Sequence, residues 1–199
     1  MVIHNRVRTS PPRNERDRAS VREALGIAAD DTVAIWIGSL DGRKDPLVAV
    51  RAADRARVTL LVVGDGPLRS TVQHAAGANA HVLGRRDDVP CLLDAADLYV
   101  STSHREVLSL FLLEAMAAGL TPIVTDLPEN VEAVDEAGLA FAPGDEAGLA
   151  DALRRLVSTD GEMARLGSEA RERVATHFDA KAMVEATLAI YDETYGGRR

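Results

Sequence analysis

Short apolar segments alternate with helical stretches along most of this chain, and this alternation limits the possible fold more than any other feature. From Thr32 onward, runs rich in Val, Ile, Leu and Thr are followed by a Gly or Pro break and then by a helical pattern. Most runs are apolar on both faces, as expected when helices cover both sides of a parallel sheet. The predicted strands are Thr32–Gly38, Thr59–Val63, His81–Leu83, Leu98–Ser101, Thr121–Thr125 and Ala140–Ala142.

Helical segments follow each of these strands. They begin near Pro46, Leu68, Val89, Leu110, Asn130 and Glu146. Repeated strand–helix units predict an α/β fold with a doubly wound parallel sheet, and we expect residues 31–178 to form one Rossmann-like domain. Such sheets bind ligands outside the carboxyl ends of their strands, so the loops after the strands are where a site is expected.

The two ends of the chain differ from this central region. Residues 1–30 begin with a charged, proline-containing stretch and are interpreted as a linker or irregular segment. Two trailing C-terminal helices are predicted at about Glu162–Ala175 and Lys181–Tyr195. The second carries one apolar stripe, so residues 179–199 are expected to pack on this domain or on a missing N-terminal domain.

Charge and composition disfavour several classes of protein. A formal net charge of -8 repels a phosphate backbone and argues against nucleic-acid binding. A single cysteine permits no internal disulfide and no cysteine metal cluster. No apolar run approaches the roughly 20 residues of a membrane helix, and the Arg-rich opening is not a secretory signal. We therefore expect a cytoplasmic protein that reaches a membrane only through another domain.

The loops after the first three predicted strands contain glycine and basic residues. Gly38 allows close approach of a ligand to the backbone, and Lys44 beside Arg43 offers charge for a phosphate; a solvated surface loop is the alternative. The Gly-Asp-Gly-Pro sequence at 64–67 is interpreted as a structural turn, because a dinucleotide fingerprint follows the first strand. Arg85 and Arg86 suit either stacking on a nucleobase or an exposed charged turn.

The segment after the fourth predicted strand is the most informative. Glu114 lies within an otherwise apolar helix, where a carboxylate is costly unless something pairs with it. Glu106 precedes that helix, whose N-terminal N–H groups suit a pyrophosphate. Two carboxylates beside such a site can accept hydrogen bonds from sugar and ribose hydroxyls. A capping carboxylate and a buried ion pair are the alternative interpretation.

Taken in order, these motifs resemble the C-terminal domain of glycosyltransferase family 4, over roughly Val2 to Tyr195. The most specific part is the stretch from Glu106 through seven residues to Glu114-Ala-Met-Ala-Ala-Gly. The resemblance implies the donor-binding half of a retaining GT-B hexosyltransferase. Such an enzyme takes a sugar from a nucleotide diphosphate sugar, and its acceptor (a glycan, lipid or small molecule) is held by the missing N-terminal domain.

The resemblance also implies a role for each site residue. Glu106 would hold the transferred sugar, Glu114 the ribose hydroxyls and Lys44 the pyrophosphate, which makes Glu106 and Lys44 the catalytic pair. No metal and no cofactor is expected, because cationic and backbone donors replace the metal. Arg85 and Arg86 would lie against the base, and the full donor-binding set is Gly38, Ser39, Arg43, Lys44, Arg85, Arg86, Glu106, Leu108, Ser109, Leu110 and Glu114.

Two departures from the family pattern bear on catalysis. Ser39 stands where members commonly have arginine, with Arg43 as the residue able to compensate, and Val107-Leu108-Ser109 replaces Gly-Phe-Gly. These changes keep open a catalytically silent nucleotide-sugar-binding or regulatory domain of the same fold. A different GT-B enzyme, such as a sugar-nucleotide epimerase, is a third hypothesis, and a dinucleotide oxidoreductase is disfavoured. Without its N-terminal domain the isolated chain is expected to be inactive.

Overall fold

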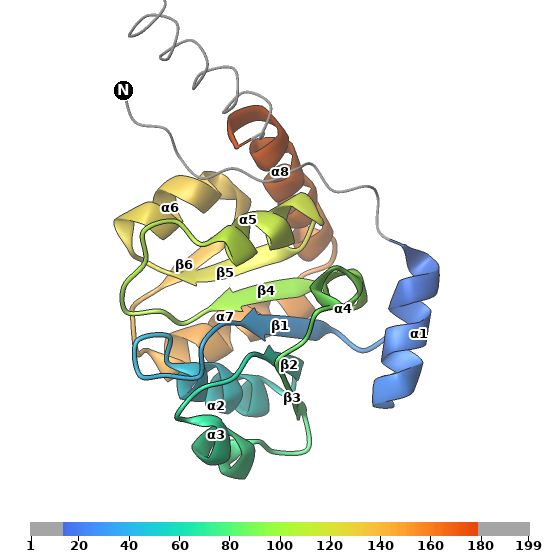
Figure 1. Ribbon diagram of the computed structural model, residues 1–199. Helices are drawn as coiled ribbons and strands as arrows, with labels where there is room; N and C mark the ends of the chain where they lie inside the picture. The colour runs from blue at the N-terminus through green and yellow to red at the C-terminus, as the bar shows by residue number, and fades with distance from the viewer. Residues whose placement is uncertain (1–13, 179–199) are drawn as a thin grey trace, which may run out of the picture.

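A computed structural model describes residues 14–178 of the chain. Its strands form one parallel sheet in the order β3-β2-β1-β4-β5-β6, which confirms the doubly wound α/β fold. The sheet lies between two layers of helices (Figure 1). The strands are β1 (Val33–Ile37), β2 (Thr59–Val63), β3 (Ala80–Gly84), β4 (Leu98–Ser101), β5 (Thr121–Thr125) and β6 (Leu139–Phe141).

Every described helix except α1 begins within two residues of its predicted start. Two starts differ, because α6 takes Pro128 into its first turn, where proline is favoured, and α3 begins one residue after Leu68. A short 3-10 turn, η1 (Asp135–Ala137), follows α6. The helices are α1 (Glu15–Leu25), α2 (Pro46–Ala56), α3 (Arg69–Ala75), α4 (Val89–Ala95), α5 (Leu110–Ala117), α6 (Pro128–Val134), α7 (Glu146–Ser158) and α8 (Glu162–His177).

The central strand β1 shows why the strands are apolar on both faces. Val33, Ile35 and Ile37 face a hydrophobic cluster completed by α1, α4, α5, α6 and much of α8. Ala34 and Trp36 point the other way, into a cluster completed by α2, α3 and α7. Every residue of β1 is buried. Side chains that alternate between two cores give the continuous apolar runs seen in the sequence.

Part of the segment interpreted as a linker is a helix. Asn14 caps the N-terminus of α1 by accepting a hydrogen bond from the Arg16 N–H, and Gly26 ends the helix in a left-handed conformation. Residues 15–25 are therefore regular where an irregular stretch was expected. The predicted helix at Lys181–Tyr195 lies outside the described residues, and the division into linker, domain and C-terminal helix stays a prediction.

The chain order reverses between two neighbouring strands at the centre of the sheet. From β1 the chain builds outward through β2 and β3, whereas from β4 it builds outward on the other side through β5 and β6. Loops that leave the carboxyl ends of β1 and β4 therefore diverge, and a crevice forms between them. Among the described helices, none is both long and apolar enough to cross a membrane.

Candidate functional site

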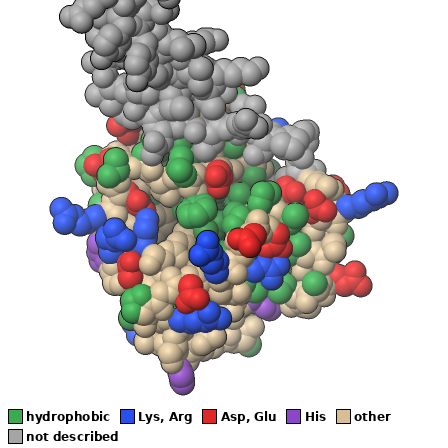
Figure 2. All heavy atoms as spheres, viewed as in Figure 1, with side chains coloured by type: hydrophobic (Ala, Val, Ile, Leu, Met, Phe, Trp, Pro, Cys, Tyr) green, Lys and Arg blue, Asp and Glu red, His purple; other side chains and the backbone are tan. Residues whose placement is uncertain are grey.

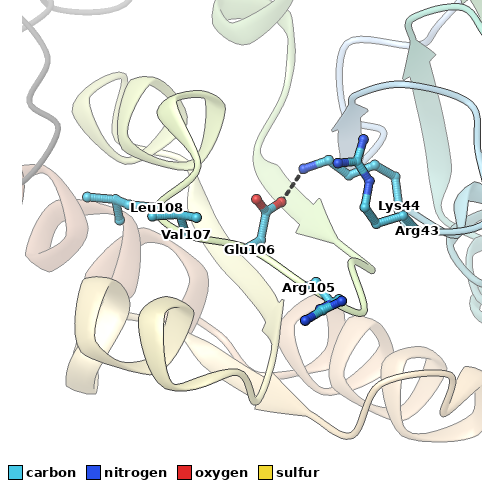
Figure 3. Close-up of a pocket in the computed structure, with 6 residues that line it drawn as sticks. All are labelled: Arg43, Lys44, Arg105, Glu106, Val107 and Leu108. Atoms are coloured by element: carbon cyan, nitrogen blue, oxygen red, sulfur yellow. Dashed lines mark hydrogen bonds and ion pairs between the residues drawn. The ribbon is translucent and has the colours of Figure 1, made fainter.

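A pocket of about 500 Å³ lies where the loops after β1 and β4 diverge (Figure 3). Two basic residues from the β1 loop face four residues from the β4 loop. On the face seen in Figure 1, Figure 2 shows hydrophobic side chains gathered in the middle, with basic and acidic side chains beside them. The pocket is lined by Arg43, Lys44, Arg105, Glu106, Val107 and Leu108.

An ion pair crosses this pocket. The Lys44 ammonium group donates to Glu106 Oε1, and Figure 3 shows the two side chains pointing toward each other from different loops. The hydroxyl of Ser103 donates to the same carboxylate oxygen at 2.8 Å. The side chains of Lys44 and Glu106 are only 22% and 11% exposed. Both charges are therefore partly shielded from water, and each acts more strongly on a bound ligand than an exposed charge would.

The loop that carries Lys44 is held by hydrogen bonds at both ends. Asp41 accepts the backbone N–H groups of Arg43 and Lys44, each at 3.0 Å, and the bond from Lys44 is the main cause of a lowered Asp41 pKa. The Thr102 hydroxyl, at the end of β4, donates to the Lys44 carbonyl at 2.8 Å and accepts from the Trp36 indole N–H at 2.9 Å. Lys44 is thus fixed relative to both central strands.

A second connection between the two loops runs through His104. Its ring Nε2 lies 2.9 Å from Asp45 Oδ2, and its backbone N–H donates to the Arg43 carbonyl at 2.9 Å. Asp45 has a left-handed backbone, with φ of 45°, directly before α2. The β1 loop and the β4 loop are therefore joined along the rim of the pocket as well as across it.

Helix α5 begins beside the pocket. Ser109 is its N-cap and accepts a hydrogen bond from the Leu112 N–H at 3.4 Å. The first N–H groups of a helix have no partner within the helix and carry its positive dipole end. Since Leu108 lines the pocket and Leu110 starts the helix, these groups lie next to the Lys44–Glu106 pair. The arrangement suits an anionic ligand.

Glu114 is partly buried in α5 and forms no hydrogen bond or ion pair with the residues that the structure describes. Burial raises the pKa of its carboxyl group. The buried Tyr99, whose hydroxyl is hydrogen-bonded to Ser109, lies within electrostatic reach of both Glu106 and Glu114. Burial is also the main cause of the raised Tyr99 pKa. Of the two carboxylates, only Glu106 has an ion-pair partner here.

Several predicted site residues do not line the pocket. Arg85 and Arg86 follow β3, which β2 and β1 separate from β4, and Arg86 donates through Nε and Nη2 to Asp88 at 2.7 and 2.5 Å. Ser39 is exposed, and its side chain is hydrogen-bonded to Asp41. The roles assigned to these residues stay predictions.

The loops after β1 and β2 approach each other closely where Gly64 meets the backbone of Gly38. A Cβ atom on Gly64, whose φ is +139°, would lie 1.8 Å from the Gly38 carbonyl oxygen. The turn at 64–67 is therefore required by backbone packing, as the sequence suggested. The predicted contact between Gly38 and a donor is not tested by this geometry.

Sequence reasoning missed three groups at the site. Arg105 and Val107 line the pocket, although Val107 was noted only as a departure from a family pattern. Ser103 was not proposed as a site residue, yet its hydroxyl holds Glu106. The three-residue spacing between Ser103 and Glu106 was the available signal. Within the described residues, no group of three or more His, Cys, Asp or Glu side chains is placed to hold a metal ion.

The sheet order defines a Rossmann-like α/β domain, and its charged pocket lies at the switch point, where such domains bind their ligands. The chain belongs to the family described as Glycosyl transferases group 1, which matches residues 31–159. N-acetyl-alpha-D-glucosaminyl L-malate synthase from Bacillus anthracis is 30% identical over 190 residues, or 89% of this chain and 49% of that protein. D-inositol 3-phosphate glycosyltransferase from Xylanimonas cellulosilytica is 32% identical, over 90% of this chain and 46% of that protein.

Solved structures show the same fold. Sucrose-phosphate synthase from Thermosynechococcus elongatus has a TM-score of 0.84 and 26% identity, over 98% of this chain and 52% of that one. HepE from Anabaena, solved with UDP and glucose, has a TM-score of 0.82 and 24% identity, over 95% of this chain and 56% of that one. These neighbours are GT-B glycosyltransferases. The chain spans about half the length of the relatives it matches.

Proposed function

We propose that this domain binds the nucleotide diphosphate sugar of a retaining GT-B glycosyltransferase. It presents a hexosyl unit to an acceptor held by a second domain. The observation that carries the proposal is the shielded Lys44–Glu106 pair at the sheet's switch point, beside the start of α5. The names of the relatives support the reaction class, and the UDP and UDP-glucose complexes of HepE support the ligand class.

Each part of the pocket has a task in this proposal. Lys44 and the N-terminal amides of α5 bind the diphosphate, and their positive charge stabilises the departing phosphate without a metal ion. Arg43 from the β1 loop and Arg105 from the β4 loop also line the pocket and add to that positive field. Glu106 accepts hydrogen bonds from the transferred sugar, and Glu114 accepts them from the ribose. The departing phosphate guides the acceptor hydroxyl to the same face of the sugar, which gives retention.

A binding module without turnover is the second candidate. It is favoured by Val107, whose side chain is 82% exposed and lines the pocket where the resembling family has glycine. A branched side chain there occupies space that a sugar would otherwise use. Sugar transfer by a protein that contains both domains separates the two candidates, because only the enzyme forms a glycosylated product.

The ligand class is tested by titration calorimetry of this chain with UDP, GDP, ADP and NAD. We expect one or more of the nucleotide diphosphates to bind more tightly than NAD. The Lys44→Ala variant should weaken that binding by about tenfold or more, since a charge-assisted hydrogen bond contributes roughly 1.5–3 kcal/mol. Arg154→Ala, which removes an exposed pair on α7, is the matched control and should change nothing. Tighter binding of NAD, or equal effects of the two variants, contradicts the proposal.

A further inference from the structure

A chain of buried polar groups runs from the pocket, past the end of β5, to α6. Ser103 Oγ donates to Glu106 Oε1 at 2.8 Å, and the Ser103 carbonyl accepts from the Thr125 hydroxyl at 2.8 Å. Asn130 Nδ2, in α6, then donates to both the carbonyl oxygen and Oγ1 of Thr125, each at 3.1 Å. Glu106 is thus connected to α6 through three residues that lie on different elements.

The direction of each bond in this chain is determined by its neighbours. The Thr125 carbonyl can only accept, so the amide nitrogen of Asn130, and not its oxygen, must face it. Thr125 Oγ1 then accepts from Asn130 and is left to donate its proton to the Ser103 carbonyl. Since only one orientation of the Asn130 amide group satisfies these hydrogen bonds, the network favours one position of the backbone at Ser103.

The three residues of the network are buried. Ser103 is 2% exposed, and Thr125 and Asn130 are 0% exposed. Among the described residues, the side-chain oxygen of Asn130 has no hydrogen-bond partner, whereas its Nδ2 donates to Thr125. Buried hydrogen bonds are costly to break, because a polar atom that loses its partner inside the protein lowers stability. The network should therefore hold the backbone at Ser103 in place.

We infer that Thr125 and Asn130 are positioning residues for Glu106, although neither lines the pocket. Residues 102–109 follow β4 without regular structure, and hydrogen bonds must therefore hold the loop in place. Through Ser103, the network fixes the Glu106 carboxylate at the position from which it meets Lys44. This inference rests on the proposed function, because the part of the ligand that Glu106 contacts is the sugar. Loss of the network should weaken recognition of the sugar while the diphosphate contacts remain.

The matched pair of variants is Thr125→Val and Thr121→Val. Both threonines lie in β5 and are 0% exposed, and Val has nearly the same shape without the hydroxyl. The Thr121 hydroxyl donates to the Met163 carbonyl, away from the pocket, so its variant reports the effect of losing a buried hydroxyl from the same strand. Thr125→Ser keeps the hydroxyl and should restore the wild-type behaviour.

Calorimetry is performed on the 199-residue chain with UDP and UDP-glucose, GDP and GDP-mannose, and ADP and ADP-glucose. For whichever pair binds, Thr125→Val should weaken the nucleotide sugar by about fivefold, the size expected for one hydrogen bond, and change the free diphosphate by less than about twofold. Thr121→Val and Thr125→Ser should leave both affinities at the wild-type level. Unchanged sugar-nucleotide affinity in Thr125→Val, or an equal loss for both ligands, overturns the inference.

Amide hydrogen exchange of residues 103–109 provides a measurement that needs no ligand. Exchange in this loop should rise in Thr125→Val and stay at the wild-type rate in Thr121→Val and Thr125→Ser. A wild-type chain that binds none of the six compounds contradicts the proposed function. The exchange rates would still show whether Thr125 holds the loop in place. If Thr125→Val leaves the loop as protected as in the wild type, Thr125 does not position Glu106.

Discussion

The ion pair between Lys44 and Glu106 bears on what diphosphate binding requires. A phosphate that approaches Lys44 competes with a carboxylate already hydrogen-bonded to the ammonium group. Glu106 also keeps its bond from Ser103, so the carboxylate remains in place when Lys44 turns to the phosphate. Under the proposed function, we therefore expect Glu106 to oppose binding of a free diphosphate and to support binding of a sugar.

Replacement of Glu106 by Gln should separate these two effects. We expect UDP, or whichever nucleotide diphosphate the chain prefers, to bind equally or up to about fivefold more tightly, because a partly exposed ion pair contributes up to about 1 kcal/mol. The corresponding nucleotide sugar should lose its advantage over the diphosphate. Calorimetry measures both, with Glu169→Gln in an exposed pair on α8 as the control. Weaker diphosphate binding in Glu106→Gln would show that the pair does not compete with phosphate.

Glu114 should lower the stability of the fold at neutral pH and raise the affinity for the nucleotide. Because burial raises its pKa in the folded state, its carboxyl group stabilises the fold most when protonated, and this contribution is lost as pH rises through the raised pKa. Glu114→Gln should therefore unfold at a higher temperature than the wild type at pH 7. The difference should shrink as pH falls through the raised pKa and should vanish below about pH 4, near the ordinary pKa of the carboxyl group. Nucleotide affinity should fall by about tenfold through a weakened ribose contact.

Thermal melts across pH and calorimetry at pH 7 test the two halves of this prediction separately. Glu136→Gln, in η1 and away from the pocket, is the control for removal of one negative charge. A Glu114→Gln variant that is less stable at neutral pH would mean that the carboxylate has a stabilising partner in the folded protein. Unchanged nucleotide affinity would remove Glu114 from the donor site.

At the scale of elements, α1 is attached to the sheet mainly by arginines. The Arg22 side chain is 4% exposed and donates to Asp97 Oδ2 at 2.9 Å, while Arg18 donates to Asp97 Oδ1 at 2.8 Å. Asp97 also accepts the Val33 N–H at 2.9 Å, at the start of β1. One carboxylate thus joins α1, β1 and the beginning of β4.

Asp97→Ala should be among the most destabilising single changes in the domain. It leaves the buried Arg22 guanidinium without its counter-charge, a loss of about 3–5 kcal/mol in the free energy of unfolding. Asp151→Ala, which removes a carboxylate that is 72% exposed and paired with Arg154 on α7, should cost less than about 1 kcal/mol. Denaturant unfolding of the two variants makes the comparison. Similar losses would show that the Asp97 cluster is no stronger than a surface ion pair.

The strands of the sheet could be predicted from the sequence, whereas the side-chain contacts that attach α1 to the sheet could not. Strands were recognisable because two cores require apolar residues on both faces, as in β1. Helix α1 was missed because its charged sequence hides the helical pattern, and its anchor, Arg22, finds its carboxylate 75 positions away. Long-range partners of this kind leave no local signal.

The same distinction applies to the site. The rule that such sheets bind ligands outside the carboxyl ends of their strands placed Lys44 and Glu106 at the same end of the sheet, and the structure brings them together in one pocket. Their mutual ion pair, and the hydrogen bonds from Ser103 and Thr102 that fix it, depend on side-chain geometry that a one-dimensional pattern does not contain. Arg85 and Arg86 were assigned to the base from the stacking chemistry of arginine and from the resemblance, and the position of β3 does not bring them to this pocket.

At the scale of the whole molecule, we propose that the described pocket is one wall of a site. The chain covers 49% and 46% of two curated relatives and 52% of sucrose-phosphate synthase. The donor groups that we propose all lie on loops of this domain or on α5, and none of the described residues has been assigned to an acceptor. We therefore propose that the acceptor is bound by a part of the protein outside the 199 residues.

The isolated chain should accordingly bind a nucleotide sugar and transfer nothing. Alignment of a second reactant supplies up to roughly 7–11 kcal/mol of enzymatic acceleration, and one wall of a site cannot supply it. The measurement is product formation from radiolabelled nucleotide sugar with glycan, lipid and small-molecule acceptors. D-inositol 3-phosphate glycosyltransferase from Xylanimonas cellulosilytica, assayed on its own acceptor, is the positive control. Binding must be verified in the same preparation by calorimetry, so that a lack of product is not caused by a misfolded chain. Binding without product supports the division of labour between two domains, whereas turnover by the 199 residues alone would place a complete acceptor site within them.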